Sequence, residues 1–133
     1  MEDRYLFKAK RVDDGEWIVG GLVRYGFTGK EKYYIVPDYA SDLYAMEIDQ
    51  NTICQCTGLK DKNSNLIWEN DVVDFKTSKA VVIWDKAEWR IKWIKDKDTI
   101  LRRDLHFWTN EDDWKCEVIG NIFDNPELLE SEG

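Results

Sequence analysis

The sequence has few of the residues that mark secreted, metal-dependent or membrane-spanning proteins. Among 133 residues there are one histidine, two prolines and three cysteines. No apolar run approaches the roughly 20 residues that cross a bilayer, which argues against a membrane protein. Residues 1–11 are charged throughout and lack a secretory signal core. Three cysteines, an odd count without an export signal, predict reduced and partly buried thiols. We therefore expect a cytoplasmic protein.

Catalytic motifs are scarce as well. The chain has no G-x-S-x-G, no H-E-x-x-H and no nucleotide-binding glycine loop, and His106 has no nucleophile motif beside it. Two groups of carboxylates are candidates for acid–base chemistry, Glu69 with Asp71 and the cluster at residues 111–113. The first pair straddles a predicted turn, and the second lies in a predicted acidic loop. We expect neither an enzyme nor a cofactor, because no converging set of catalytic roles is visible.

The charge is unevenly distributed. The net charge is −8, and it divides into −5 over residues 1–75, +5 over residues 76–103 and −8 over residues 104–133. The overall acidity argues against a strong, nonspecific nucleic-acid binder. The acidic residues 111–132 are a candidate to dock on the basic residues 76–103 of the same or a neighbouring chain, since complementary patches set register and partner choice.

Alternation of apolar and polar residues recurs along the chain and predicts strands. It is clearest at residues 88–94, where Trp89, Ile91 and Trp93 alternate with charged residues. Further strands are expected at residues 5–12, 16–27, 32–36, 44–49, 53–57, 80–85 and 115–123, with short helices at 101–108 and 126–129. Many short strands at this spacing indicate a mainly β fold, a small β-barrel or a pair of packed sheets with one or two short helical segments.

Turn residues punctuate this pattern. Asp13-Asp14-Gly15 predicts a hairpin turn with Gly15 at positive φ. The pair Gly20-Gly21 inside a strand suggests a bulge or a close backbone contact. The pattern predicts one β domain over residues 1–125, and a weak boundary near residue 50 would divide it into an N-terminal sheet (1–50) and a barrel (51–125). Residues 126–133 are expected to be a helical turn, with Asn125 as N-cap, and a tail.

The polar stretch at residues 61–65 invites a metal interpretation. Asp61, Asn63 and Asn65 mimic the first three ligands of a calcium loop, D-x-N-x-N. However, Leu66 stands where the loop needs glycine, and Val72 where it needs a bidentate glutamate. A solvated hairpin turn is therefore the better interpretation.

Four residues could in principle form a zinc site: Cys54, Cys56, His106 and Cys116. Residues two apart on a strand share one face, so both Cys54 and Cys56 can simply belong to the core. We favour buried thiols and expect no metal.

Three segments resemble the YopX family of phage and prophage proteins. Residues 48–73 read IDQNTICQCTGLKDKNSNLIWENDVV, which is similar to the family pattern TGLKDKNGKEIYEGDIV. FKAKRVDDGEWIVGGLV at residues 7–23 and CEVIGNIFDNPELLE at residues 116–130 resemble two further family segments. The resemblance implies a mostly β protein with SH3-like barrel character and no established activity.

Two departures from this pattern concern turns. The chain has Asn63-Ser64 where the pattern has Asn-Gly, and Glu69-Asn70-Asp71 where it has Glu-Gly-Asp. Asparagine is the residue that best replaces glycine at positive φ. We therefore expect Asn70 to adopt the left-handed conformation. At the first turn we expect Asn63 or Asn65 to do so, with Ser64 in another geometry.

The basic middle holds the candidate binding residues: Trp84, Lys86, Arg90, Lys92 and Lys95. Tryptophans interleaved with cations are how small barrels hold single-stranded nucleic acid. Strand alternation instead predicts that Trp89 and Trp93 fill the core while Arg90 and Lys92 face water. Exposure of the tryptophans decides between the two interpretations.

These observations together favour a non-catalytic phage or prophage accessory protein in the host cytoplasm. It would act as a protein-binding or self-assembling β module, with itself (as a homo-oligomer) or a host or phage protein as partner. The alternative is a single-stranded nucleic-acid binder that uses residues 84–95. Acidic mimicry of DNA is a third hypothesis, which rests only on the net charge.

Overall fold

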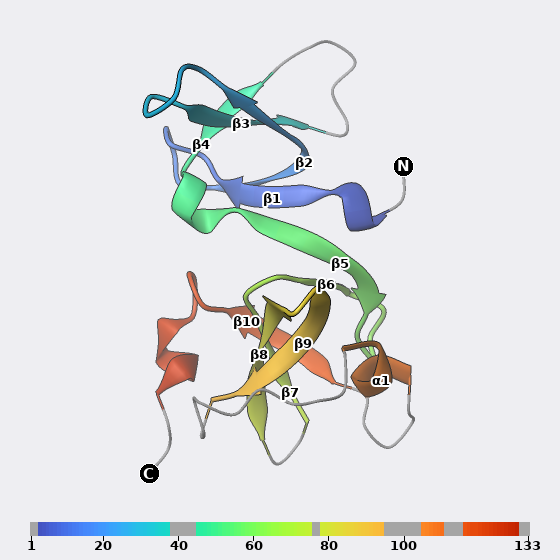
Figure 1. Cartoon of the computed structure of the whole chain (residues 1–133). Coiled ribbons are helices and arrows are strands. Elements are labelled where there is room, and N and C mark those ends of the chain that lie inside the picture. The colour runs from blue at the N-terminus through green and yellow to red at the C-terminus, as the bar shows by residue number, and fades with distance from the viewer. Residues whose placement is uncertain (1–2, 38–44, 76–77, 95–104, 111–115, 131–133) are drawn as a thin grey trace. The chain divides into compact units, whose positions relative to one another are not determined.

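The structure is a computed structural model, and it describes residues 3–37, 45–75, 78–94, 105–110 and 116–130. Its strands are β1 (Phe7–Lys10), β2 (Trp17–Tyr25), β3 (Lys32–Pro37), β4 (Met46–Ile48), β5 (Cys54–Lys60), β6 (Leu66–Trp68), β7 (Asp71–Asp74), β8 (Lys79–Asp85), β9 (Glu88–Trp93) and β10 (Glu117–Asn121). The helical pieces are η1 (Asp3–Tyr5), η2 (Gln50–Thr52), α1 (Leu105–Asn110) and η3 (Pro126–Leu129). The prediction of a mainly β fold is confirmed (Figure 1).

The strands form two antiparallel sheets. Six strands pair in the order β4-β3-β2-β1-β5-β6, and four pair in the order β10-β7-β8-β9. Neither order returns to its first strand within the described residues, so no closed barrel is seen there. The chain divides into two compact units, Met1–Cys56 and Thr57–Gly133. The boundary falls within β5, whose first residues pair with β1 in the first unit.

The first unit begins with the predicted β1–β2 hairpin. Gly15 has φ 73°, and the Arg11 amide donates to the Glu16 carbonyl at 2.9 Å. The turn places Lys10 opposite Trp17 and continues in register to Phe7 opposite Gly20. The turn prediction is confirmed, but the strand is shorter than expected, since Tyr5 lies in the 3₁₀ turn η1 and is 55% exposed.

The Gly20-Gly21 pair marks a close contact between β2 and β3. A Cβ atom on Gly20 would lie 1.9 Å from the Val36 carbonyl oxygen, whereas one on Gly21 would meet no atom within 4 Å. The predicted close backbone contact is therefore confirmed at Gly20. The register of β2 and β3 runs without a shift from Gly20–Pro37 to Tyr25–Lys32.

The core of the first unit lies on one face of its sheet. Ala9, Ile18, Ile35 and Ile48 come from four successive strands of the sheet, and all are buried. Burying an isoleucine side chain contributes about 1.5–3 kcal/mol, so these residues hold the four strands together.

A short seam links the two ends of this four-stranded set. Arg11 forms an isolated antiparallel bridge with Ile48. The Val12 amide donates to the Glu47 carbonyl at 3.1 Å, and the Asp49 amide donates to the Lys10 carbonyl at 2.8 Å. The chain after β1 therefore also pairs with β4, which curves the sheet around its core.

The second unit has its own core. Buried residues of β6, β7, β8, β9 and α1 meet there together with Cys116: they are Ile67, Val73, Ala80, Val82, Ile91 and Leu105. The helix predicted at residues 101–108 is observed from Leu105 onward, and residues 101–104 lie outside the described part.

The carboxyl-terminal segment ends in the predicted helical turn, η3. Pro126 occupies the first turn as expected, but Asn125 makes no side-chain cap to the helix. Its Oδ1 instead accepts a hydrogen bond from the backbone amide of Asn121 at 3.2 Å. Pairing of β10 with β7 shifts register between Val118 and Gly120, as at a β-bulge, and continues on both sides of the shift.

Candidate binding surface

The tryptophans and cations that the structure describes at residues 84–93 do not share one face. β8 and β9 place Trp84 opposite Trp89 and Ile83 opposite Arg90. Because side chains alternate along a strand, Trp89 and Arg90 point to opposite sides of the sheet. Trp89 packs against the core of the second unit, as does Trp93. The predicted inward direction of these two tryptophans is confirmed.

Trp84 differs from them because it lies at the end of the hairpin. Its side chain is 55% exposed and meets the Trp89 ring edge to face, with centroids 4.9 Å apart. The adjacent turn consists of Lys86 and Ala87, both at positive φ. Trp84 and the exposed Lys86 are thus neighbours in one hairpin, but no second aromatic side chain of this hairpin is comparably open.

Arg90 is engaged by acidic neighbours on its own face. Its guanidinium contacts the Glu88 carboxylate at 3.1 Å and the Asp85 carboxylate at 3.8 Å, and its side chain is 17% exposed. Lys92 is half-buried opposite Val81. Lys95 lies outside the described residues. The four predicted binding residues that are described therefore do not meet in one cationic and aromatic groove.

The turn at residues 61–65 is built around a buried carboxylate. Asp61 is 7% exposed, and its Oδ1 accepts hydrogen bonds from the backbone amides of Asn63 and Asn65, each at 2.9 Å. Its Oδ2 accepts from the Val118 amide at 2.9 Å. Residues 62–65 are exposed, as the prediction of a solvated hairpin turn requires, but Asp61 is buried, because its carboxylate joins this turn to β10.

The left-handed residue of this turn is Ser64, with φ 66°. The expectation that Asn63 or Asn65 would take this conformation is wrong. The backbone amides of Asn63 and Asn65, on either side of Ser64, both donate to the Asp61 carboxylate, and this fixes Ser64 at the corner of the turn.

The second turn agrees with the prediction. Asn70 has φ 71°, so it replaces glycine there as expected. Asp71 is 2% exposed and accepts a hydrogen bond from the Trp68 amide at 2.8 Å. These contacts stabilise the turn. Of the candidate acid–base pair Glu69 and Asp71, the Asp71 carboxylate is therefore hydrogen-bonded to the backbone.

All three cysteines are buried, as predicted. Burial, reinforced by the nearby Asp61 carboxylate, raises the pKa of the Cys116 thiol to about 11. Within the described ranges, no three His, Cys, Asp or Glu side chains lie close enough together to hold a metal ion.

A different surface combines aromatic, aliphatic and cationic side chains. It is the side of the β1–β4 sheet opposite the buried core of the first unit, and we call it the outer face. The β1–β2, β2–β3 and β3–β4 registers place eleven residues on it: Lys8, Lys10, Trp17, Val19, Gly21, Val23, Tyr25, Lys32, Tyr34, Val36 and Glu47. All of them are half-buried or exposed.

One end of the outer face is cationic. The Lys8 ammonium lies 4.8 Å from the centroid of the Trp17 ring, and the Lys10 ammonium lies 5.4 Å from the same centroid. Lys10 is the direct cross-strand neighbour of Trp17, and Lys8 is its diagonal neighbour. Cation–π attraction holds both ammonium groups at this ring. We call these three residues the lysine end.

The other end is apolar and open. Val23 and Tyr25 are 42% and 74% exposed, and Phe27, in the turn that follows β2, is 85% exposed. We call these three residues the aromatic end. Between the two ends, Gly21 leaves open space where other residues of the strand carry a side chain. Nearby, Lys32 and Glu47 approach to 4.0 Å across β3 and β4.

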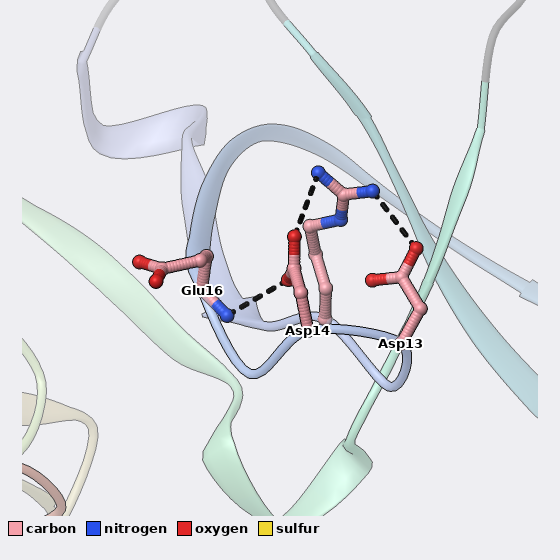
Figure 2. A network of polar contacts seen from close by, with 4 residues as sticks. Asp13, Asp14 and Glu16 are labelled. Atoms are coloured by element: carbon pink, nitrogen blue, oxygen red, sulfur yellow. Dashed lines mark hydrogen bonds and ion pairs between the residues drawn. The ribbon is translucent and has the colours of Figure 1, made fainter.

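The β1–β2 turn carries a compact ion-pair network. The Arg11 guanidinium lies between two carboxylates, at 2.9 Å from Asp13 and 3.4 Å from Asp14, and the Asp14 carboxylate also accepts from the Glu16 amide (Figure 2). The hydrogen bond from Arg11 lowers the pKa of Asp13 below its ordinary value. This network fixes the turn that sets the Lys10–Trp17 register.

A shallow cleft of about 410 Å³ follows the seam in the same unit. Both signs of charge line it, including Lys10, Arg11 and Lys32 against Glu31, Glu47 and Asp49. Its mixed charge and open shape single out no ligand. The outer face is therefore the better candidate for a binding surface, and sequence reasoning did not identify it.

These features define a small, mainly β protein of two compact units, and none of the helices that the structure describes is long and apolar enough to cross a membrane. The family model described as "YopX protein" matches residues 6–130, so the chain belongs to the YopX family. The crystal structure of protein EF1440 from Enterococcus faecalis is similar over 93% of this chain and 96% of that one, with 25% identity and a TM-score of 0.59. No curated protein matches the chain.

Proposed function

We propose that this YopX protein is a non-catalytic phage or prophage accessory protein that acts in the host cytoplasm by binding another protein chain through the outer face. The observation that carries the proposal is the exposure of Val23, Tyr25 and Phe27 at one end of that face. Exposed clusters of large apolar side chains mark interaction sites on soluble domains. Tyrosine and phenylalanine are also enriched in the centres of interfaces.

A second copy of the chain is the partner we propose first. A homo-oligomer would bury the exposed side chains of the aromatic end. Repulsion between two chains of net charge −8 would be weakened at the interface, because the outer face itself carries lysines. The sequence led us to expect a barrel at residues 51–125, but the seam between Lys10–Val12 and Glu47–Asp49 supports SH3-like barrel character for the first unit instead, since it brings the two ends of the four-stranded set together.

Sedimentation velocity over a range of micromolar concentrations tests this proposal. We expect the wild-type protein to associate with increasing concentration and the double variant Tyr25→Ser/Phe27→Ser to stay monomeric. The matched control is Tyr5→Ser/Val12→Ser, which removes two other exposed apolar side chains, 55% and 59% exposed. A strictly monomeric wild type, or equal association of both variants, would refute self-assembly through the aromatic end.

Single-stranded nucleic-acid binding is kept as the second candidate because of one observation. Trp84 is 55% exposed beside the exposed Lys86, so one base could stack there. Titration with an oligothymidine strand at two salt concentrations, followed by tryptophan fluorescence, tests it. Quenching that is absent, or that persists in Trp84→Ser, would remove this site.

A further inference from the structure

We infer that two copies of the chain associate by main-chain pairing of β2, with residues 22–25 of one copy lying antiparallel to the same residues of the other. The inference rests on the proposed function and specifies its contact. The two sheets join edge to edge, and the aromatic ends of both copies come together at the joint.

The second half of β2 has an open edge because β2 continues past the start of β1. β1 begins at Phe7, opposite Gly20, whereas β2 runs on to Tyr25. The partner of this second half is β3, whose pairing extends from Gly20 to Tyr25. Among the strands that the structure describes, none lies along the other edge of residues 22–25. An unpaired strand edge is a template for pairing with another chain.

The chain that precedes β1 does not fill this edge. If the β1–β2 register continued, Tyr5 would come opposite Leu22, but Tyr5 lies in η1. The Leu6 carbonyl accepts from the Cys56 amide at 2.9 Å, so the chain before β1 stays beside β5. The edge of β2 is therefore left uncovered where the 3₁₀ turn replaces the strand.

The main-chain groups of Leu22 and Arg24 point to the open edge. The β2–β3 turn closes with a hydrogen bond of 2.7 Å from the Lys30 amide to the Phe27 carbonyl, and the ladder continues from there without a shift. Residues that bond to a given neighbour alternate in an antiparallel ladder, so the odd-numbered residues of this half bond to β3. Leu22 and Arg24 thus direct two N–H donors and two carbonyl acceptors to the other side.

This edge is complementary to a second copy of itself. Antiparallel pairing about a two-fold axis at Val23 sets Leu22 opposite Arg24 of the second copy, and the reverse, so both residues exchange hydrogen bonds on both copies. Pairing centred on Arg24 would set like charges directly opposite each other. Pairing centred on Leu22 would need Gly20, which already lies opposite Phe7 of β1. The register centred on Val23 is therefore the favoured one.

The side chains at the edge add apolar contact to this pairing. Val23, Arg24 and Tyr25 are all exposed, and Phe27 follows in the turn. Tyr25 and Phe27, at 74% and 85% exposed, each offer on the order of 150 Å². That area is well below the roughly 800 Å² per partner of a standard interface. The main-chain hydrogen bonds should therefore carry much of the affinity, and we expect association at micromolar concentrations.

Disulfide trapping under mild oxidation tests the register. In the proposed pairing the two Val23 Cα atoms lie about 4.5 Å apart, within the span of a disulfide, so Val23→Cys should be trapped as a covalent dimer. The matched control is Arg24→Cys, because the two Arg24 Cα atoms would lie about 7–8 Å apart on the diagonal. We expect at least tenfold faster trapping of Val23→Cys, with the wild type, whose cysteines are buried, as background.

A proline at the edge tests the main-chain hydrogen bonds. Arg24→Pro removes an outward N–H donor from each copy and leaves the β3 ladder its donors. We expect it to weaken association about tenfold in sedimentation velocity. Arg24→Ala loses the same side chain but keeps the N–H group, and it should associate within about threefold of the wild type. Circular dichroism checks that both variants fold, and trapping of Val23→Cys tests the pairing without a proline.

Two results would overturn the inference: trapping of Arg24→Cys as fast as Val23→Cys, or a folded Arg24→Pro protein that associates as strongly as Arg24→Ala. If either occurs while the Tyr25→Ser/Phe27→Ser variant is monomeric, the aromatic end associates through side chains alone. The proposed function then stands, and only the edge pairing is removed. A strictly monomeric wild type, in contrast, removes self-assembly and edge pairing together.

Discussion

The two adjacent glycines of β2 allow a prediction in which the same substitution has opposite effects. Gly20→Ala places a Cβ atom 1.9 Å from the Val36 carbonyl oxygen, 2.8 Å from the Val36 carbonyl carbon and 2.9 Å from the Pro37 Cα. All three are backbone atoms, so no side-chain rotation relieves the overlap. Gly21→Ala places its Cβ in open space.

The size of the effect follows from what must move. To restore ordinary contact, β3 must retreat from β2 by roughly 1.5 Å, which breaks the nearest ladder hydrogen bonds. Overpacking costs about 1–3 kcal/mol, and each lost hydrogen bond about 1 kcal/mol. We therefore expect Gly20→Ala to lower the free energy of unfolding of the first unit by about 3 kcal/mol. Gly21→Ala should raise it by about 0.5 kcal/mol, because alanine restricts the unfolded chain more than glycine does.

Urea unfolding followed by far-ultraviolet circular dichroism measures the free-energy difference. Hydrogen exchange read by mass spectrometry on peptides from β2 and β3 assigns it to the first unit, since the two compact units can unfold separately. Equal midpoints for the two variants, or a more stable Gly20→Ala protein, would refute the close approach of Gly20 to Val36.

Three further predictions concern the second unit. Asp61→Ala should lower the free energy of unfolding by about 3 kcal/mol in urea titrations, because three backbone amides lose their acceptor. A loss below about 1 kcal/mol would contradict this. Ser64→Gly should raise the same quantity by about 0.5 kcal/mol, since glycine adopts φ 66° without strain; a destabilised variant would count against it. The Cys116 thiol, with its pKa raised to about 11 from 9.0, stays protonated when the unfolded chain ionises, so stability should be constant below about pH 9 and fall by about 2 kcal/mol as pH approaches 11. Cys116→Ala should remove that slope, and an unchanged slope would contradict the assignment.

Local patterns predicted most of the strands and their directions. Alternation at Trp89, Ile91 and Trp93 pointed these side chains to the core, where they lie, because one face of β9 carries only apolar residues. Alternation gave no information about how far the core extends. Trp84 is on the same face and is exposed, since it lies at the end of the hairpin, beyond the residues that would cover it.

The left-handed residue of the first turn could not be assigned from residue preference. Asparagine is favoured at positive φ, yet Ser64 adopts it. The reason is a long-range contact. One oxygen of the Asp61 carboxylate accepts from the backbone amides of Asn63 and Asn65, while the second accepts from the backbone amide of Val118, 57 residues away. A single sequence contains no signal for that partner, so the energetic preference of one residue was overridden by three hydrogen bonds to another.

The net positive charge of residues 76–103 does not by itself mark a binding surface, because charge along the chain does not say which side chains meet in the sheet. Arg90 contributes to the total of +5 over residues 76–103, but in the sheet its guanidinium lies beside Glu88 and Asp85. Both carboxylates are already subtracted in that total, so a net charge over a segment does not show which cations lie beside an acidic side chain and which face solvent. The pairing of β8 with β9 makes that distinction.

The outer face, in contrast, had a signal in the sequence. Apart from Arg24, residues 17–25 are apolar on both sides of the strand: Ile18 and Leu22 face the core, while Trp17, Val19, Val23 and Tyr25 face outward. An antiparallel strand with one wet face should read as alternating, so a strand that is apolar on both faces predicts a second contact. The hairpin turn at Asp13–Gly15 also fixes Lys10 opposite Trp17 and Lys8 opposite Val19. These two facts together place cations beside an exposed apolar row, and they do so from residues within 20 positions of one another, where sequence reasoning is strongest.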